Sequence, residues 1–307
     1  MKTKHIPVLA DESIHYLINK ESGVYVDCTL GTGGHFTKIS ENTNKDAILI
    51  GLDADQKAIE YCQKNLDIPQ KHFFINTNFK NLKKYCYRHG YLDVSGILMD
   101  LGMSSFALDD AKRGFSYDKS GPLDMRFSKD QKTTAAEFIN TAEPEELREV
   151  LQKYGEVRRP SAIVNGILEH RSSKKIETTT ELKQIIARRT PYRLRKKILS
   201  QVFQAIRIKI NNELEILEKA LEQALQLLEP EGRLVVISYH SLEDRIVKHF
   251  FKEKAKDCIC PPEFPICKCD HQQEVEILTS SPKTPSQEEI DKNPRARSAK
   301  LRVIEKL

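Results

Sequence analysis

The sequence predicts an α/β protein, a parallel sheet flanked by helices and interrupted by a helical insertion. Between Val24 and Asp100, apolar strand-like runs alternate with amphipathic segments at the spacing of βαβ units. From about Ser105 to Ile210 the strand pattern stops and only helical patterns and loops follow, before strand-like runs resume. We therefore expect one domain formed by residues 1–105 and 211–307, with an inserted helical domain at residues 106–210.

Four strands are expected in the first third of the chain, with amphipathic segments such as Asp55 to Asn65 between them. Their sequences are "VYVDC", "AILIGL", "HFFIN" and "VSGILMD". Right-handed crossovers place the carboxyl ends of all four strands at one edge of the sheet, where ligands of such sheets bind.

The insertion is expected to be helical because of patterns such as "EPEELREVLQKYG", with Pro144 in a first turn, and "TTELKQIIARR", with a threonine cap. A long amphipathic helix from Asn212 to Leu228 should end at Pro230 and Gly232. The sheet then resumes at "RLVVISY", followed by a helix around Asp244 to Lys254 and strands near "VEIL" and "AKLRVIE".

The composition excludes several classes of protein. Hydrophobic residues make up 39% of the 307 residues and charged residues 30%, as in ordinary globular proteins. No run approaches the roughly 18 apolar residues of a membrane span, and the N-terminus has no signal-like apolar region. Seven cysteines, an odd number, argue against a disulfide framework. We expect a cytoplasmic protein without membrane contact; the net charge of +5 says little by itself.

The glycine-rich stretch "DCTLGTGGHF" does not fit a phosphate-binding loop. A P-loop needs a lysine and then Ser or Thr after its last glycine, but His35 and Phe36 stand there. A dinucleotide fingerprint counted from Gly31 and Gly33 needs a third glycine where Phe36 stands. Both phosphate-binding interpretations therefore fail.

What remains is an acidic residue, Asp27, followed by Gly31, Gly33 and Gly34. This pattern suits S-adenosylmethionine, which carries no phosphate. The carboxylate can receive the amino group of the methionine moiety, and the glycines let the backbone approach the nucleoside. The alternative is a tight turn between strand and helix that binds nothing.

The next strands favour the cofactor interpretation. Asp53 ends the second strand, where an acidic side chain can bind ribose hydroxyls, although it could instead cap the next helix. Phe79, after the third strand, could form a flat wall for adenine or pack in the core. Asp100 stands at the end of the fourth strand. Four strand ends in series each present a suitable residue at one edge, which predicts a cofactor site there.

Several longer motifs identify a family. "DCTLGTGGH", "GILMDLGMSS", "RGFSY" with "GPLDMR", "SYHSLEDRIVK" and "NPRARS" are spread over nearly the whole chain. With them the sequence resembles the bacterial small-subunit ribosomal RNA cytosine-N4 methyltransferases, the MraW or RsmH family. The family's cofactor contacts map onto Gly33, Gly34, His35, Asp53, Phe79 and Asp100.

The resemblance implies a Rossmann-like class I S-adenosylmethionine methyltransferase domain whose helical insertion recognises the substrate. It also implies methyl transfer to N4 of one decoding-region cytidine in the 16S rRNA of the small ribosomal subunit. This chain differs from the family at a position that is usually glutamine, because "SSFALDD" has Phe106 and Ala107 there. A side-chain contact to the cofactor is lost at that point. Whether the protein forms a homodimer stays open.

The acceptor amine needs positioning, because its lone pair is delocalised into the cytosine ring. Transfer is an in-line displacement, so placement carries much of the rate. A hydrogen-bond acceptor for an N4 hydrogen helps further, and Asp100 is the first candidate, with Ser104 or Ser105 beside it. His240 and Glu243 in "SYHSLEDR" could contact the base. Alternatively, Ser241 to Asp244 form a helix cap with an acidic first turn.

A basic stretch is the main candidate for binding RNA. From Leu182 to Asn212 there are nine basic residues and no acidic one. Such a run is usually a solvated face, but its density suits phosphate contacts. Phe115 in "RGFSYDKSGPLDMRF" could stack on a base or pack in the core. The candidate RNA contacts are Arg113, Phe115, Arg126, Arg188, Arg189, Arg193, Arg195, Lys196, Arg295 and Arg297.

Four cysteines are concentrated in "CICPPEFPICKCDH". Cys258, Cys260, Cys267 and Cys269 could close a tetrahedral structural zinc site. The usual spacing is C-x₂-C rather than C-x-C, and reduced surface thiols on a proline-stiffened loop are the alternative.

Two rival functions are compatible with the sequence. The first is a methyltransferase for DNA or another RNA. The second is an RNA-binding assembly factor that keeps the cofactor fold without turnover, for which the alanine at position 107 is the only support.

Overall fold

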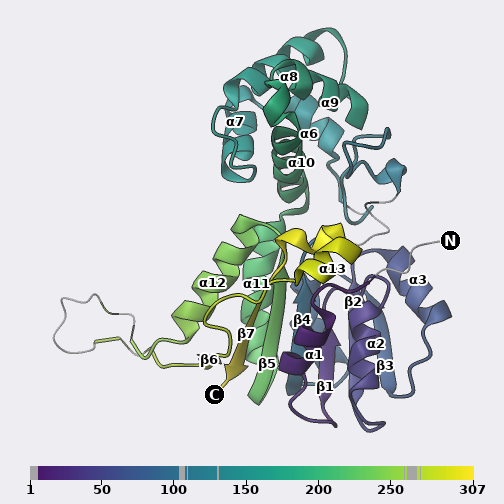
Figure 1. The fold of residues 1–307 in the computed structure, drawn as a ribbon, viewed down its shortest axis with the longest axis vertical. Helices are drawn as coiled ribbons and strands as arrows, with labels where there is room; N and C mark the ends of the chain where they lie inside the picture. The colour runs from purple at the N-terminus through teal and green to yellow at the C-terminus, as the bar shows by residue number, and fades with distance from the viewer. Residues whose placement is uncertain are drawn as a thin grey trace. The chain divides into compact units, whose positions relative to one another are not determined.

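The computed structural model describes residues 6–103, 108, 110–129, 131–258, 260, 268–269 and 271–307. The chain divides into two compact units (Figure 1): unit 1 joins Met1–Gly102 to Leu214–Leu307, and unit 2 is Met103–Glu213. Among the described residues, no helix is both long and apolar enough to cross a membrane. What each unit does stays a prediction.

Unit 1 is built on a seven-stranded sheet with the strand order β3-β2-β1-β4-β5-β7-β6. The first five strands run parallel, whereas β7 is antiparallel to both of its neighbours. This mixed sheet with flanking helices is a Rossmann-like arrangement, so the predicted α/β fold is confirmed. The strands are β1 (Val24–Asp27), β2 (Ile48–Asp53), β3 (Lys71–Asn76), β4 (Val94–Asp100), β5 (Leu228–Ser238), β6 (Val275–Ile277) and β7 (Lys300–Lys306).

Helices cover both faces of this sheet. Successive residues of a strand point to opposite faces, so a buried strand has apolar side chains on both sides that must be covered. Tyr25 of β1 packs in the cluster with α1, α2 and α3, whereas its neighbour Val26 packs in the cluster with α4, α11 and α12. The helices of unit 1 are α1 (Ala10–Leu17), α2 (Gly34–Glu41), α3 (Gln56–Asn65), α4 (Leu82–Arg88), α11 (Glu213–Leu227), α12 (Ser241–Lys254) and α13 (Gln287–Lys292), with the 3₁₀ turns η1 (Phe79–Asn81) and η4 (Pro294–Ser298).

Two predicted boundaries differ from the structure. Asn212 has a left-handed backbone (φ 52°) that ends α10, so the long helix begins one residue later. Strand β5 already starts at Leu228, so Pro230 and Gly232 lie inside it. Its pairing with β4 shifts register between Val94 and Gly96. A β-bulge of this kind accommodates a proline that lacks a ladder donor.

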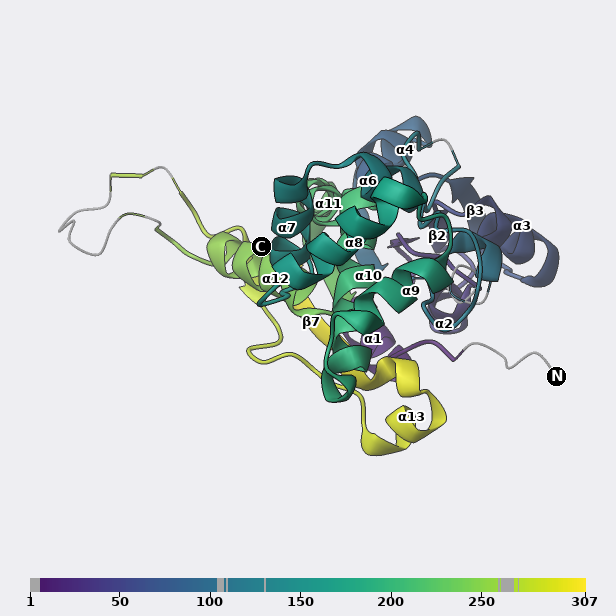
Figure 2. The same ribbon diagram turned by 90° about the horizontal axis from the view of Figure 1, so that it is seen from above.

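Unit 2 is helical, as the insertion was expected to be, and has its own apolar core. Helix α10 packs against α6, α7 and α9, and Figure 2 looks down on this group. Pro144 stands in the first turn of α7, and Thr178 caps α9 in a capping box with Glu181. The described elements are η2 (Ala111–Arg113), α6 (Ala135–Thr141), α7 (Pro144–Lys153), α8 (Ser161–Ser173), α9 (Thr179–Arg188), η3 (Tyr192–Leu194) and α10 (Arg195–Asn211).

Candidate functional site

Three carboxylates stand at one edge of the unit 1 sheet, each at the last residue of a strand. Asp27 ends β1, Asp53 ends β2 and Asp100 ends β4. Strand β1 pairs in parallel with β2 on one side and β4 on the other, so the three aspartates lie on neighbouring strands (Figure 1). Because like charges repel, this edge disfavours a phosphate and favours a ligand that carries a cation or hydroxyl groups.

The glycine loop after β1 needs glycine at two positions. Gly31 and Gly33 have positive φ angles of 52° and 78°, a region that other residues enter only with strain. A Cβ on Gly33 would also meet the side chain of Leu66 at 2.4 Å. Gly33 precedes the first residue of α2, and its amide bonds the carbonyl of Leu30. The loop is therefore a tight strand-to-helix turn whose shape is set by its own contacts.

Asp53 holds this loop in place. Its Oδ2 accepts a 2.8 Å hydrogen bond from the amide of Gly31, and its Oδ1 accepts one from the amide of Asp55. The cap of α3 is Asp55, not Asp53. A carboxylate accepts hydrogen bonds from hydroxyl groups as well as from amides, so Asp53 is chemically suited to the hydroxyls of a ribose.

Asp27 is a buried carboxylate with an oxygen that finds no partner among the described residues. Its side chain is 1% exposed, and Oδ1 accepts from the amide of Thr29 at 3.0 Å, whereas the buried Oδ2 has no hydrogen bond there. Burial raises the pKa of Asp27 to about 6, although the charge of His35 opposes the shift. A buried oxygen of this kind suits a cationic or donating ligand.

His35 and Asp100 form a charged pair at this edge. The His35 ring is buried in the first turn of α2, with Nε2 3.5 Å from Asp100 Oδ2. That contact is an ion pair without hydrogen-bond geometry. Burial lowers the pKa of His35, but Asp100 and then Asp27 outweigh it, so the pKa is raised overall. The positive charge is thus favoured between two carboxylates.

Tyr239 is a residue of this group that the sequence analysis missed. It follows β5, and its hydroxyl donates a 2.7 Å hydrogen bond to Asp100 Oδ1. Burial, and then the Asp100 charge, raise the pKa of Tyr239 well above its usual value, so the hydroxyl keeps its proton. Gly102, with φ of 126°, would bring a Cβ within 3.1 Å of this ring. The signal was available, since Tyr239 is the last residue of the predicted strand "RLVVISY".

Phe79 lies in η1, immediately after β3 and at the same edge of the sheet. It is partly buried and packs against the apolar cluster beneath that face. Asn78 caps the turn through the amide of Lys80. The ring is therefore fixed by core contacts while part of its surface stays exposed, which combines the two alternatives considered for it.

His240 and Glu243 form a capping box at the start of α12. His240 Nδ1 accepts from the Glu243 amide at 3.3 Å, and Glu243 Oε2 accepts from the amide of Tyr239 at 2.9 Å. Asp244 binds Arg302 and Lys300 of β7. These contacts match the helix-cap alternative. Ser104 and Ser105, like Phe106 and Ala107, lie outside the described residues.

Four of the nine basic residues in the stretch at 183–209 have acidic partners elsewhere in unit 2. The positive charges of these four side chains are therefore balanced by carboxylates from outside the stretch. The pairs are Lys183 with Asp118, Arg189 with Glu169, Arg207 with Glu213 and Lys209 with Glu146.

The remaining positive charges are concentrated around η3. We define the basic turn as Arg188, Arg193, Lys196 and Lys197, all exposed and without an ion pair to any described residue. Tyr192, 82% exposed, lies at its centre. The guanidinium of Arg195 lies 5.4 Å from the centre of that ring. Exposed aromatic rings beside exposed cations are typical of proteins that bind single-stranded nucleic acid.

Three candidate RNA contacts in residues 113–127 have structural partners. Phe115 is buried and stacks on Phe127, as its core-packing alternative expects. Arg126 forms a two-pronged pair with Asp124, and Arg113 donates to the carbonyls of residues 126 and 127. These contacts hold the loop in shape, and a role of the three residues in binding RNA stays a prediction.

Arg295 and Arg297 lie in η4 of unit 1, and both are exposed. Ala296 between them is fully buried and anchors the turn. A role of this segment in binding RNA stays a prediction.

Three of the four clustered cysteines are described. Cys258, Cys260 and Cys269 are half-buried, whereas Cys28, Cys62 and Cys86 are buried in unit 1. Cys267 lies outside the described residues.

Comparison with known proteins identifies the family of this chain. The family model described as MraW methylase family matches residues 2–307. Proteins named "Ribosomal RNA small subunit methyltransferase H" are 45% identical in Halothermothrix orenii, over 99% of both chains, and 48% identical in Dehalococcoides mccartyi, over 99% of this chain and 86% of that one. A Streptococcus mutans methyltransferase structure in complex with SAH aligns over 99% of this chain at 13% identity and a TM-score of 0.46. The sequence matches alone establish that this chain belongs to the MraW methylase family.

Proposed function

We propose that this protein transfers a methyl group from S-adenosylmethionine to N4 of a decoding-region cytidine in 16S rRNA. The observation that carries the proposal is the end-to-end match to proteins named for small-subunit ribosomal RNA methylation. The carboxylate-lined edge of unit 1 supports it, since it combines a nucleoside-type site with an acceptor group. A cytoplasmic location belongs to the same proposal.

The residues present fit S-adenosylmethionine better than a phosphate-bearing cofactor. Asp27 offers a buried carboxylate oxygen for a positively charged group. Asp53 offers lone pairs for ribose hydroxyls, and Phe79 offers a fixed ring for adenine. Three neighbouring carboxylates would repel a phosphate. When bound, the cofactor supplies a methyl group on a positively charged sulfur atom.

Asp100 is the residue we assign to the acceptor amine. As a carboxylate it can accept a hydrogen bond from an N4 hydrogen, which turns nitrogen lone-pair density toward the incoming carbon. Tyr239 fixes the carboxylate from one side and His35 from the other. Such preorganisation removes the cost of orienting the acceptor during reaction. No strong base is required, because the N4 proton becomes acidic once nitrogen carries the new substituent.

Unit 2 is proposed to bind the RNA through the basic turn. Its four exposed cations suit phosphates, and the exposed Tyr192 ring suits a base that has left its stack. This assignment moves the RNA contacts away from Arg113, Phe115 and Arg126, which are held by the protein itself.

Methyl-labelled cofactor separates the proposal from its rivals. Purified protein is incubated with assembled small subunits, free 16S rRNA, other RNA and DNA, and label in each nucleic acid is counted. Label confined to 16S rRNA supports the proposal. Equal or greater label in DNA or unrelated RNA would show instead that the protein is a methyltransferase for one of those substrates. Cofactor binding without label in any of them would favour an assembly factor.

A further inference from the structure

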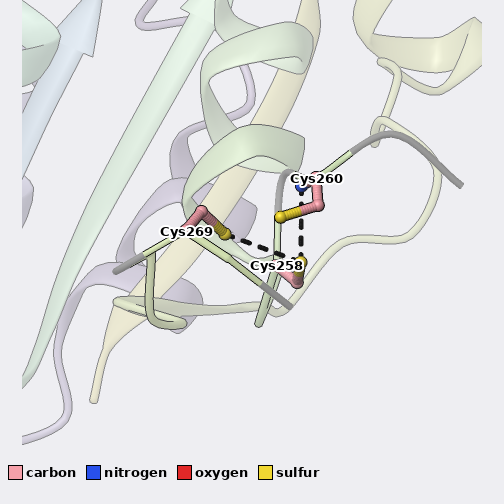
Figure 3. A group of neighbouring side chains, drawn as sticks. All are labelled: Cys258, Cys260 and Cys269. Carbon is pink, nitrogen blue, oxygen red and sulfur yellow. Dashed lines mark hydrogen bonds between the residues drawn. The ribbon is translucent and has the colours of Figure 1, made fainter. Parts of the chain in front are cut away.

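The loop between α12 and β6 brings three cysteine sulfurs together. Cys258 and Cys260 lie on the segment that leaves α12, and Cys269 lies on the segment that returns toward β6. Their three Sγ atoms all lie within 4.8 Å of one another. Figure 3 shows the side chains converging from the two segments toward a common point. Residues of the loop between α12 and β6 thus form a second chemical cluster in unit 1.

The sulfur spacing fits shared coordination better than a disulfide. The Sγ atoms of Cys258 and Cys269 are 3.6 Å apart. A disulfide would hold them about 2.05 Å apart. Two thiolates on one tetrahedral zinc, each about 2.3 Å from the metal, stand about 3.8 Å apart. The observed separation is close to the edge of such a tetrahedron.

Backbone amides point at two of these sulfurs. The amide of Cys260 donates to Cys258 Sγ at 3.3 Å, and the amide of Lys268 donates to Cys260 Sγ at 3.3 Å. Donors of this kind commonly surround metal-bound sulfurs and orient them. Cys28, Cys62 and Cys86 are buried instead, and burial raises the pKa of Cys62 and Cys86 to about 12 and that of Cys28 well above its usual value, which keeps them as thiols.

The base of the loop is already closed by contacts, so a metal would complete an existing scaffold. The amide of Glu274 bonds the carbonyl of Lys254 at 2.9 Å, and His271 Nε2 lies 3.1 Å from the carbonyl of Glu253. Lys254 also pairs with Glu274 and Glu222. None of the three cysteines is fully buried, so a metal ion can reach their sulfurs. Binding there would cross-link the two segments.

We propose that Cys258, Cys260 and Cys269 bind a zinc ion that ties the two segments of the loop together. Three thiolates select a soft or borderline metal such as zinc over magnesium or calcium. A structural site is four-coordinate, so a fourth ligand completes the set. The site is separate from the carboxylate edge, and the proposal does not depend on the proposed methylation.

The test begins with metal content. Protein purified under reducing conditions without chelator is analysed by inductively coupled plasma mass spectrometry, and one equivalent of zinc per chain is expected. After removal of zinc, cobalt should restore occupancy and give the charge-transfer and tetrahedral d–d absorption of cobalt bound to thiolates. Protein that holds no zinc and gives no such bands with cobalt would overturn the proposal. A Cys258–Cys269 disulfide in protein handled in air, with no metal bound by the reduced form, would do so equally.

Variants locate the site. Cys258→Ser and Cys269→Ser should each lose most of the bound zinc, whereas Cys86→Ala, which removes a cysteine of the core, should keep it. Retention of zinc by both serine variants would contradict the assignment. If a serine variant fails to fold, the cobalt spectrum of the wild type still decides the question.

Limited trypsin digestion tests the cross-linking role. Lys256 and Lys268 are exposed on the two sides of the loop. Removing zinc should speed cleavage after these lysines by about tenfold or more, which is the effect of roughly 1.4 kcal/mol in local opening. Cleavage rates unchanged by zinc removal would exclude a structural role. Neither measurement uses methyl transfer, so a failure here leaves the proposed function standing.

Discussion

The hydroxyl of Tyr239 donates a 2.7 Å hydrogen bond to Oδ1 of Asp100, while Nε2 of His35 lies 3.5 Å from Oδ2 of the same carboxylate. The three residues come from the end of β5, the end of β4 and the first turn of α2. Each oxygen of Asp100 is therefore held by a separate element. A carboxylate whose orientation is fixed in this way is suited to accept a hydrogen bond from a substrate amine.

Tyr239→Phe should lower the rate of methyl transfer and leave cofactor binding unchanged. Phenylalanine keeps the ring beside Gly102 but removes the hydrogen bond to Asp100. A hydrogen bond to a charged group contributes about 1.5–3 kcal/mol, so kcat should fall about 10-fold to 100-fold. Single-turnover rates and calorimetric binding of S-adenosylmethionine check this. Tyr117→Phe, which removes a hydroxyl bonded to Ser200 in unit 2, is the matched control. An equal loss in both variants would show that the Asp100 contact has no special role.

Asp27→Asn should stabilise the protein without cofactor at pH 8 but not near pH 4. The pKa of Asp27 is about 6 in the folded state against an ordinary value of 3.8. The folded state therefore binds this proton more tightly than the unfolded state. Stability falls as pH rises from about 4 to about 6, and the full penalty above that range is about 3 kcal/mol.

Denaturant unfolding of wild type and Asp27→Asn at both pH values measures this difference. The exposed Asp46→Asn is the control and should change little at either pH. A variant that is less stable than wild type at pH 8 would contradict the buried-charge account of Asp27.

Gly33→Ala should cost more stability than Gly90→Ala. Both glycines have φ near 80°, so alanine pays a similar backbone cost of about 1–2 kcal/mol at each position. At Gly33 the added Cβ also meets Leu66 at 2.4 Å, whereas Gly90 has nothing within 4 Å. Thermal unfolding compares the two, and binding of S-adenosylmethionine should weaken only for Gly33→Ala. Equal effects on stability would mean that the loop moves to absorb the methyl group.

The double variant Arg193→Gln, Lys196→Gln should reduce the salt dependence of RNA binding. Each phosphate contact on single-stranded RNA contributes about 0.7 to the log–log slope, so the slope should fall by about 1.4. Lys183→Gln with Lys209→Gln removes the same charge from lysines that already pair with Asp118 and Glu146, and should change the slope less. Anisotropy titrations of a 16S-derived fragment at several salt concentrations measure both. Identical slopes for the two double variants would refute the basic turn as the RNA-binding surface.

The fold was predictable where the pattern is local. Periodicity and glycine signals placed the first four strands and the aspartates that end three of them, because β1, β2 and β4 are buried apolar runs with a polar end. The start of β5 was missed, since Pro230 and Gly232 are ordinary break signals and only the bulge against β4 admits them. The antiparallel direction of β7 depends on pairing between distant segments and has no local signature.

The site was less predictable because partners come from distant positions. Tyr239 acquires its role only when β5 pairs with β4. Lys209 and Arg189 looked unpaired because Glu146 and Glu169 approach them only in the folded helices. The partners of Arg113 were not predictable either, because they are backbone carbonyls that approach it only in the folded loop.

The most direct test of the central claim is the chemical identity of the product. Small subunits that lack the modification are incubated with wild-type protein and S-adenosylmethionine carrying a deuterated methyl group, and the 16S rRNA is digested for nucleoside mass spectrometry. The account predicts the heavy methyl in N4-methylcytidine, with Asp100→Asn strongly reduced in rate although it still binds cofactor. Heavy methyl on carbon 5, on a ribose oxygen or on another base would contradict it.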